Sequence, residues 1–562
     1  MKIKYLITTL YLSVLFISPI FINLYFEDKN ATIYFALSIP VILYFYKINF
    51  VNFNLNKKKL FFYSDKLFFL ILFIFTFISQ NIDLNYETLT WDTASYLVAS
   101  RQVLEGYLPF EIQWESKGPL FLYLYSIPLY FSFNNLVYFK LLNDLIIYFV
   151  AVNIFKINQL KYQSRTLSIS STLLFLLVVS KEWYVSEFSE IYVLLIFSYL
   201  FIKFEKMKDR ELRTIDVLII GFLYTSLTLI NQGTILFLLP ISIYFLKNKK
   251  YQIRHLAIFL SIFISMHLIV YLTYYLKNLS HIYLANYVLV PLAYSSENLS
   301  SFYELRVWIR EYYSYNAFLM LAYLIIGLNT FNYLYRNKKF FDFYFLNLLI
   351  ALSVYFVGSH NYYHHLFYLI FLLSVSHYAN YNYFKTYKNL LALTVLVSLV
   401  SFSLNYSNKS INNLININNI QKEYPIYQLS NEIKNTLQKD NYSVFAIDYV
   451  LVLYYLEKYN FSYIVHPSNH FEPSVENTFV KLGIIPLNNV QKLIYQEPDV
   501  ILCNDTLIIR GEVTKFGDFN CNITDYLKNY LQIDTTLFNS NINRDRYRDN
   551  QKKMNVFIKL DN

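Results

Sequence analysis

The feature that most constrains this chain is a series of apolar runs, each close to the length of a membrane-spanning helix. Such a helix needs about 20 mostly apolar residues. Hydrophobic residues make up 56% of the 562 positions and charged residues only 15%, which is more apolar surface than a soluble domain can bury. The pattern predicts an α-helical polytopic membrane protein with about 13 transmembrane helices. The runs cover residues 5–25, 31–46, 67–82, 136–155, 166–180, 190–202, 215–230, 233–246, 256–276, 314–335, 341–357, 362–380 and 388–405.

One more apolar stretch, 119–133, decides the topology. If it crossed the membrane, the basic loop 156–165 would lie outside. If it lies along the membrane surface, the loops that fall inside contain 24 Lys and Arg, and those that fall outside, up to residue 405, contain seven. Loops on the cytoplasmic side carry the excess of Lys and Arg. We therefore expect a surface-lying helix, a cytoplasmic N-terminus and an extracytoplasmic C-terminal part.

This topology predicts the domain organisation. Residues 1–405 form the transmembrane domain, and its first outer loop covers 83–135. An Asn-rich linker, 406–424, leads to a small extracytoplasmic α/β domain at 425–562, because the last segment is polar enough to fold in water. Its strand-like runs are 444–448, 462–465 and 499–502, and its helical stretches are 426–438 and 488–495.

The few glycines exclude the common phosphate-cradling loops. None of the nine glycines is separated from another by a single residue, so the G-x-G-x-x-G pattern cannot occur. No glycine pair has the Walker A spacing followed by Lys. Both an ATP-driven pump and a Rossmann-type nucleotide-sugar enzyme are disfavoured. Any group that the protein transfers is expected to arrive already activated.

Charge and cysteines narrow the partners. The net charge of +10 comes mainly from basic residues in short loops between apolar runs, which indicates membrane insertion and not nucleic-acid binding. Cys503 and Cys521 belong to no C-x-x-C pair, so a zinc site at the cysteines is not expected. A disulfide and two free thiols both stay open.

The first outer loop carries the most distinctive polar residues. Asp92 follows the third apolar run closely, at the outer membrane boundary, where partial burial can raise the basicity of a carboxylate. Further along, Glu115-Ser-Lys-Gly-Pro-Leu120 places an acid and a cation beside a turn that Gly and Pro favour. Simpler roles are open too, since Asp92 could cap a helix and Lys117 could reach lipid head groups.

This loop resembles the first periplasmic loop of the GT-C superfamily of membrane glycosyltransferases. The bacterial branch similar to protein O-mannosyltransferases and lipid A aminoarabinose transferases is the most similar. The residues that carry the resemblance are Asp92, Tyr96, Ala99-Ser-Arg101, Gly106-Tyr107, Pro109-Phe110 and Lys117-Gly-Pro-Leu120. Weaker similarities occur at Lys140–Asn143, Ser189-Glu190, His364-His365-Leu-Phe, Tyr454–His466 and Pro498–Ile501.

Two departures accompany the resemblance. Thr93 follows Asp92 where relatives carry a second acid, and Lys117-Gly-Pro stands where they have Lys-Pro-Pro. The first departure leaves metal dependence open. No cofactor is expected with certainty, and a divalent metal ion remains an option.

The resemblance implies an inverting transfer of a sugar from a polyprenyl-phosphate donor to a lipid, glycan or protein acceptor. The reaction would take place at the outer face of a bacterial inner membrane, among membrane lipids. Asp92 would be the general base on the acceptor hydroxyl, and Glu190 a second acid that orients the acceptor or the sugar. Lys117 would stabilise the leaving phosphate. Further candidates for donor-phosphate contacts are Arg101, His364, Arg306 and Arg310.

Two other functions fit a chain with many spans and a few charges at the membrane boundary. One is a transporter or flippase for a lipid-linked glycan. The other is a glycan polymerase or ligase. Enzymes of that kind usually need a large outer loop, which residues 277–313 could imitate. Polar residues concentrated at one membrane face, and not at the midplane, favour the transferase over the carrier.

Overall fold

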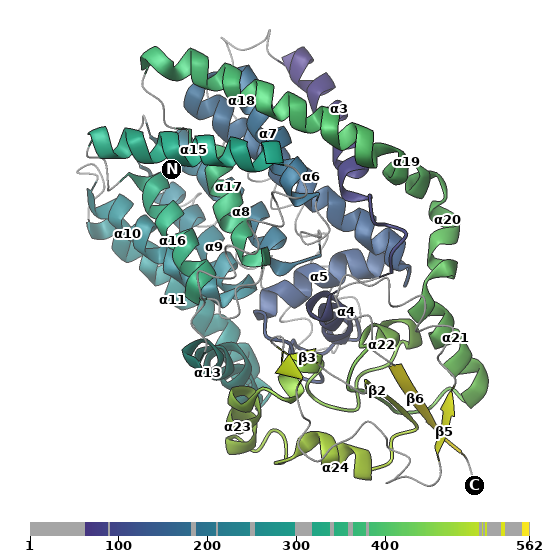
Figure 1. Ribbon diagram of the computed structural model, residues 1–562. Coiled ribbons are helices and arrows are strands. Elements are labelled where there is room, and N and C mark those ends of the chain that lie inside the picture. The colour runs from purple at the N-terminus through teal and green to yellow at the C-terminus, as the bar shows by residue number, and fades with distance from the viewer. Residues whose placement is uncertain are drawn as a thin grey trace.

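The computed structural model consists of a helical bundle joined to a smaller α/β part (Figure 1). It describes residues 62–87, 90–180, 187–208, 212–247, 253–297, 317–337, 342–357, 363–377, 381–504, 508–509, 512–513, 530–533 and 554–560. The predicted spans 5–25 and 31–46 lie outside this part of the chain.

Every apolar run from residue 67 onward coincides with a helix of the bundle. The run 233–246 is divided between a 3-10 turn, η2 (Gln232–Phe237), and α10, and the run 362–380 between η4 (Tyr363–Leu366) and α17. The bundle helices are α3 (Phe62–Gln80), α6 (Leu136–Tyr162), α7 (Arg165–Val179), α8 (Ser189–Met207), α9 (Thr214–Ile230), α10 (Leu238–Lys247), α11 (Ile253–Leu276), α15 (Ala317–Asn337), α16 (Phe343–Val357), α17 (Phe367–Val375) and α18 (Tyr381–Phe402).

The outer faces of several bundle helices are apolar. On α11, Ile264 and Leu268 are 61% and 51% exposed, and Leu393 and Leu396 of α18 are similarly open. Within the described residues, α6 and α11 are long and apolar enough to cross a membrane by length and composition, and shorter apolar helices accompany them. Two such helices alone would be weak support. Large contiguous apolar faces, however, need lipid or a partner to cover them, so they favour the predicted membrane architecture.

Two helices of the first outer loop lie between the bundle and the C-terminal part (Figure 1). Helix α4 (Trp91–Leu104) begins after Thr90, whose side chain accepts a hydrogen bond from the Thr93 amide. Helix α5 (Pro119–Phe131) begins with proline, which suits the first helical position. Its 13 residues extend about 20 Å, less than the roughly 30 Å hydrocarbon layer. This length agrees with a surface-lying helix, although its place relative to a bilayer stays a prediction.

The C-terminal part contains a four-stranded sheet in the order β1-β2-β6-β5. Strands β1 and β2 are parallel, with Val444 opposite Val500, and the other two pairs are antiparallel. The predicted strand 462–465 is wrong, because Ile464 only makes an isolated bridge with Trp114. The strands are β1 (Val444–Ala446), β2 (Val500–Asn504), β5 (Tyr530–Ile533) and β6 (Met554–Lys559), with a separate pair β3 (Ile508–Ile509) and β4 (Glu512–Val513).

Helices surround this sheet and extend toward the bundle. In the second outer segment, which begins at residue 277, α13 (Val290–Glu297) packs against α23 (Pro473–Lys481). Cys503 in β2 is disulfide-bonded, which decides between the two states that the sequence left open for this residue. The helices are α21 (Pro425–Leu437), α22 (Leu451–Leu456), η7 (Pro467–His470), α23 (Pro473–Lys481) and α24 (Asn489–Tyr495), with α12 (Ser280–Leu284), η3 (Ala285–Leu289) and α13 (Val290–Glu297) in the second outer segment.

The segment predicted as a linker, 406–424, connects the two parts as a string of short helices. Lys409 Nζ lies 2.6 Å from Asp83 Oδ1. Asn413 Nδ2 donates to the Asn81 and Ile82 carbonyls, at 3.0 and 2.9 Å. These contacts attach the connection to the end of α3. The helices are η5 (Ser403–Ser407), α19 (Asn408–Ile415), α20 (Ile417–Ile420) and η6 (Gln421–Glu423).

The first outer loop and the C-terminal part share one packed core. Gln113, only 2% exposed, donates from Nε2 to the Asn460 and Ser462 carbonyls at 3.1 and 2.9 Å. Its Oε1 accepts from the Asn460 amide at 3.0 Å. The Trp114 amide donates to the Tyr463 carbonyl at 2.8 Å. The C-terminal part is therefore held against the loop that carries the predicted catalytic residue.

Candidate functional site

Asp92 lies in the first turn of α4, where the positive end of the helix dipole favours an anion. Its Oδ1 is 3.5 Å from Nε2 of His466, a residue of the C-terminal part. The Ser468 hydroxyl is 2.8 Å from the other imidazole nitrogen. Trp91 packs edge-on against the His466 ring and donates from Nε1 to Asp448 Oδ1 at 2.9 Å. Residues from both ends of the described chain thus build the surroundings of Asp92.

The two charges of this pair stabilise each other. Burial alone would raise the pKa of Asp92, but the hydrogen bond and positive charge of His466 hold that pKa well below its usual value. Burial would lower the pKa of His466, but Asp92 raises it above its usual value. The expectation that burial makes Asp92 more basic is therefore wrong for this environment. These shifts favour the ionised carboxylate and the protonated imidazole.

A second ion pair joins Lys117 of the first outer loop to Glu190 in the first turn of α8. Lys117 Nζ is 3.7 Å from Glu190 Oε1, and the Glu190 side chain is fully buried. Asn231 Nδ2 donates to the same oxygen at 3.1 Å, and Ser189 Oγ donates to the other at 3.0 Å. Burial would lower the pKa of Lys117, but the charges of Glu190 and Asp92 raise it. The ammonium is therefore charged.

Gly118 explains why the sequence reads Lys-Gly-Pro. The Gly118 amide donates to the Ile230 carbonyl at 2.9 Å, where the chain leaves α9. A Cβ atom on residue 118 would lie 2.0 Å from the Leu229 carbonyl oxygen. A proline here would lack the N–H and collide with α9. The glycine lets the loop approach α9 closely and so brings Lys117 to Glu190.

Glu115 also belongs to the site, although no catalytic or binding role was predicted for it from the sequence. Its side chain is fully buried. Oε1 accepts from the Ser116 amide and hydroxyl at 2.7 and 2.8 Å, whereas Oε2 has no hydrogen-bond partner among the described residues. Burial raises the pKa of Glu115, and the nearby Asp92 charge adds to this, although His466 opposes it. In the sequence, the signal that could have indicated a site role for Glu115 was its position two residues before Lys117 in the same motif. No sequence spacing pointed to His466.

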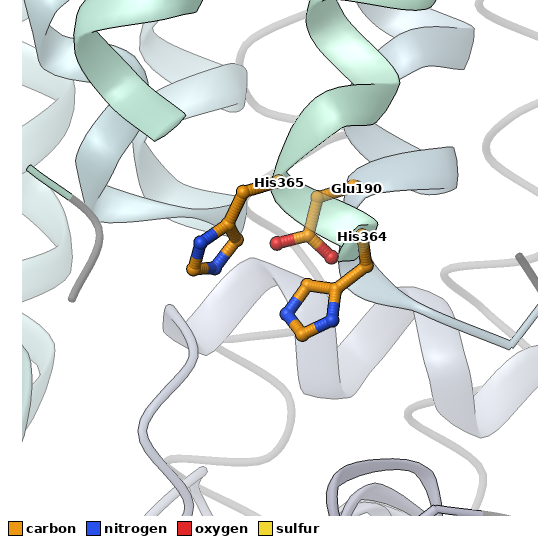
Figure 2. Close-up of side chains that lie close together, drawn as sticks. All are labelled: Glu190, His364 and His365. Carbon is orange, nitrogen blue, oxygen red and sulfur yellow. The ribbon is translucent and has the colours of Figure 1, made fainter. Parts of the chain in front are cut away.

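His364 and His365 approach Glu190 from η4, the turn that opens α17. The potential ligand atoms of these three residues all lie within 4.8 Å of one another. Figure 2 shows both imidazole rings beside the Glu190 carboxylate. The Phe188 ring stacks on His364 at 4.4 Å between centroids, which fixes the ring plane. His364 also lies close enough to Asp92 and Lys117 to interact with them electrostatically.

The structure therefore brings together Asp92, Lys117, Glu190 and His364, but it directs Arg101 elsewhere. Arg101 is 7% exposed, and its Nη2 donates to the Tyr454 carbonyl of α22 at 3.1 Å. It attaches α4 to the C-terminal part. Arg306 and Arg310 lie outside the described residues.

Two solved structures share this fold. The crystal structure of ArnT from Cupriavidus metallidurans bound to undecaprenyl phosphate is similar with a TM-score of 0.56, at 9% identity, over 88% of this chain and 98% of that chain. The apo state of the same protein gives a TM-score of 0.51, at 9% identity, over 78% and 92%. No family model matches the sequence. No curated protein matches it either.

The class that this fold defines is a helical bundle joined to a smaller α/β part. Within that class, the protein has the fold of ArnT. An identity of 9% shows the fold alone, so neither the specific branch nor the reaction follows from the likeness.

Proposed function

We propose that the protein is a membrane glycosyltransferase that moves a sugar from a polyprenyl-phosphate donor to an acceptor at the outer face of the membrane. The observation that carries the proposal is the meeting of Asp92, Lys117 and Glu190 at the junction of bundle and C-terminal part. The ArnT structure with bound undecaprenyl phosphate supports this donor class, because that protein shares the fold.

Asp92 is the general base of the proposed reaction. Its lowered pKa keeps the carboxylate ionised throughout the physiological pH range, and it also makes the carboxylate a weaker base than an ordinary Asp. The acceptor hydroxyl gives its proton to Asp92 while its oxygen attacks the anomeric carbon of the sugar. The carbon–oxygen bond to the polyprenyl phosphate breaks on the opposite side, so the configuration inverts. His466 holds the carboxylate in place at 3.5 Å.

Lys117 stabilises the leaving group. The polyprenyl phosphate departs with negative charge, and a buried ammonium lowers the energy of that charge more effectively than an exposed one would. Glu190, held by Asn231 and Ser189, orients the ammonium. The same carboxylate is the candidate for contacts with the hydroxyls of the sugar or acceptor.

The test is sugar release from a panel of radiolabelled polyprenyl-phosphate sugars by the detergent-purified protein. We expect Asp92→Asn to lower turnover by roughly 100-fold or more, the usual contribution of a general base. Glu105→Gln is the matched control. It changes another carboxylate at the end of α4, whose contact is the Tyr459 hydroxyl at 2.6 Å, and should keep turnover.

Equal turnover in Asp92→Asn and wild type would assign the base to another residue. Absence of turnover with every donor, together with passage of lipid-linked glycan across proteoliposomes, would establish the carrier function instead. Joining of lipid-linked glycans to one another would establish the polymerase or ligase.

A further inference from the structure

A second chemical site lies where α8 and α17 begin, and η4 contributes two of its three side chains. Glu190 contributes a carboxylate, and His364 and His365 contribute imidazoles, with potential ligand atoms within 4.8 Å of one another. Glu190 and His364 are buried, and His365 is partly buried. Figure 2 shows the three side chains converging from two helices.

Neighbouring residues orient two of these side chains, Glu190 and His364. Asn231 and Ser189 each donate a hydrogen bond to one Glu190 oxygen. Phe188 stacks on the His364 ring at an interplanar angle of 15°. Outer contacts of this kind orient the ligands of a metal ion and set their affinity.

The Lys117 contact leaves room for a second cation at Glu190. The distance of 3.7 Å exceeds the 2.7–2.9 Å of a tight charge-assisted hydrogen bond, so the ammonium satisfies the carboxylate only in part. A buried carboxylate is costly unless positive charge or hydrogen bonds compensate it. An additional cation between the carboxylate and the imidazoles would complete that compensation.

We propose that Glu190, His364 and His365 bind a divalent transition-metal ion, with zinc as the best fit. Two imidazole nitrogens and one carboxylate oxygen form a set that zinc accepts in four-coordinate sites with one open position. Magnesium and calcium prefer oxygen ligands alone. Ligand atoms on one zinc ion lie about 3.4 Å apart, and the potential ligand atoms here lie within 4.8 Å of one another. They must therefore draw closer by at most about 1.4 Å when the ion binds.

The ion and Lys117 share the Glu190 carboxylate. Two cations beside one carboxylate repel each other strongly in a buried site. Binding of the ion therefore weakens the hold of Glu190 on Lys117 and frees the ammonium for another anion. The metal site does not depend on the proposed transferase activity, and its test measures binding alone.

The test uses the full chain in detergent, purified through an affinity tag without histidines and stripped with a chelator. Zn²⁺ is titrated against a fluorescent competing chelator, and the absorption spectrum of bound Co²⁺ gives a second readout. We expect one ion per chain. Glu190→Gln, His364→Ala and His365→Ala should each weaken Zn²⁺ binding by at least about tenfold and change the Co²⁺ spectrum.

Two variants make the experiment decisive. His281→Ala, an exposed histidine on α12, should leave the affinity unchanged. Lys117→Met should tighten Zn²⁺ binding by at least about tenfold, because it removes the competing cation. A gain in affinity is not what loss of the folded site predicts, so this variant, once shown to be folded, keeps the test valid if a histidine variant unfolds.

Absence of Zn²⁺ and Co²⁺ binding by the wild type would overturn the proposal. Unchanged affinity in a folded His364→Ala/His365→Ala double variant would overturn it as well, since the ion would then bind elsewhere. Unchanged affinity in Lys117→Met would refute the sharing of Glu190.

Discussion

At the scale of single residues, Asp92 shows how far a motif can be interpreted without the fold. Its place after the third apolar run marked it as a candidate base, and the structure places it beside Lys117 and His466. Its lowered pKa could not be predicted, because the cause is His466, which no local pattern connects to the first outer loop. Glu115 was visible in the sequence, but its full burial was not.

The Asp92–His466 pair predicts a change in pH dependence. In His466→Gln the positive charge is lost while the burial remains, so the pKa of Asp92 should rise. The acidic limb of the kcat/KM profile should then move up by about one pH unit or more, the usual effect of removing one close opposite charge.

The measurement is donor turnover between acidic and neutral pH. His281→Gln, on the exposed surface of α12, is the control and should keep the wild-type profile. A profile that stays in place in His466→Gln would show that His466 does not set the pKa of the base.

At the scale of elements, the sequence predicts helices better than the breaks between them. Apolar runs of helical length predicted the bundle helices, because burial in lipid or against a neighbouring helix requires only that the side chains are hydrophobic. The break between α9 and α10 depends on one side chain. Asn231 accepts from the Gly233 amide at 3.0 Å and holds Glu190 with its other end. Such a double role has no signature in hydropathy.

Gly118→Ala tests the close approach of the first outer loop to α9. The added Cβ would lie 2.0 Å from a backbone oxygen, so the loop must move. We expect a loss of roughly 3 kcal/mol, at the upper end for overpacking, together with lower donor turnover because Lys117 moves with residue 118. Thermal unfolding in detergent and turnover report the two effects.

Gly327→Ala is the matched control, because no atom of the described residues lies within 4 Å of the added carbon. It should leave the unfolding temperature unchanged or raise it slightly, since alanine favours a helix. Equal behaviour of the two variants would contradict the packing described for Gly118.

At the scale of the whole molecule, the C-terminal part completes the site. The sequence predicted an α/β segment, and the structure has the sheet there, but its attachment to the first outer loop could not be foreseen. The Gln113 side chain makes that attachment by hydrogen bonds to the backbone groups of Asn460 and Ser462. Every residue type carries these backbone groups, so the sequence does not indicate which residues will be bound.

Gln113→Leu should loosen the C-terminal part. The substitution leaves buried backbone groups of residues 460 and 462 without partners, which costs about 1–3 kcal/mol for each group. We expect faster proteolysis within residues 425–504 and lower turnover, because His466 moves away from Asp92. Gln428→Leu, whose hydrogen bond to Lys422 is exposed, should change neither quantity. Wild-type turnover in a protease-sensitive Gln113→Leu would mean that the site does not need the docked domain.

The contact between Asp92 and His466 also sets an order of events during biosynthesis. Asp92 is synthesised early, whereas His466 is made only after every helix of the bundle up to α18. Until then Asp92 lacks both its contact with His466 and the C-terminal residues that surround it, so the site is incomplete. A chain whose synthesis or insertion stops before its last third therefore has an incomplete site and no transferase activity. Activity is expected only once the C-terminal part has been made and docked.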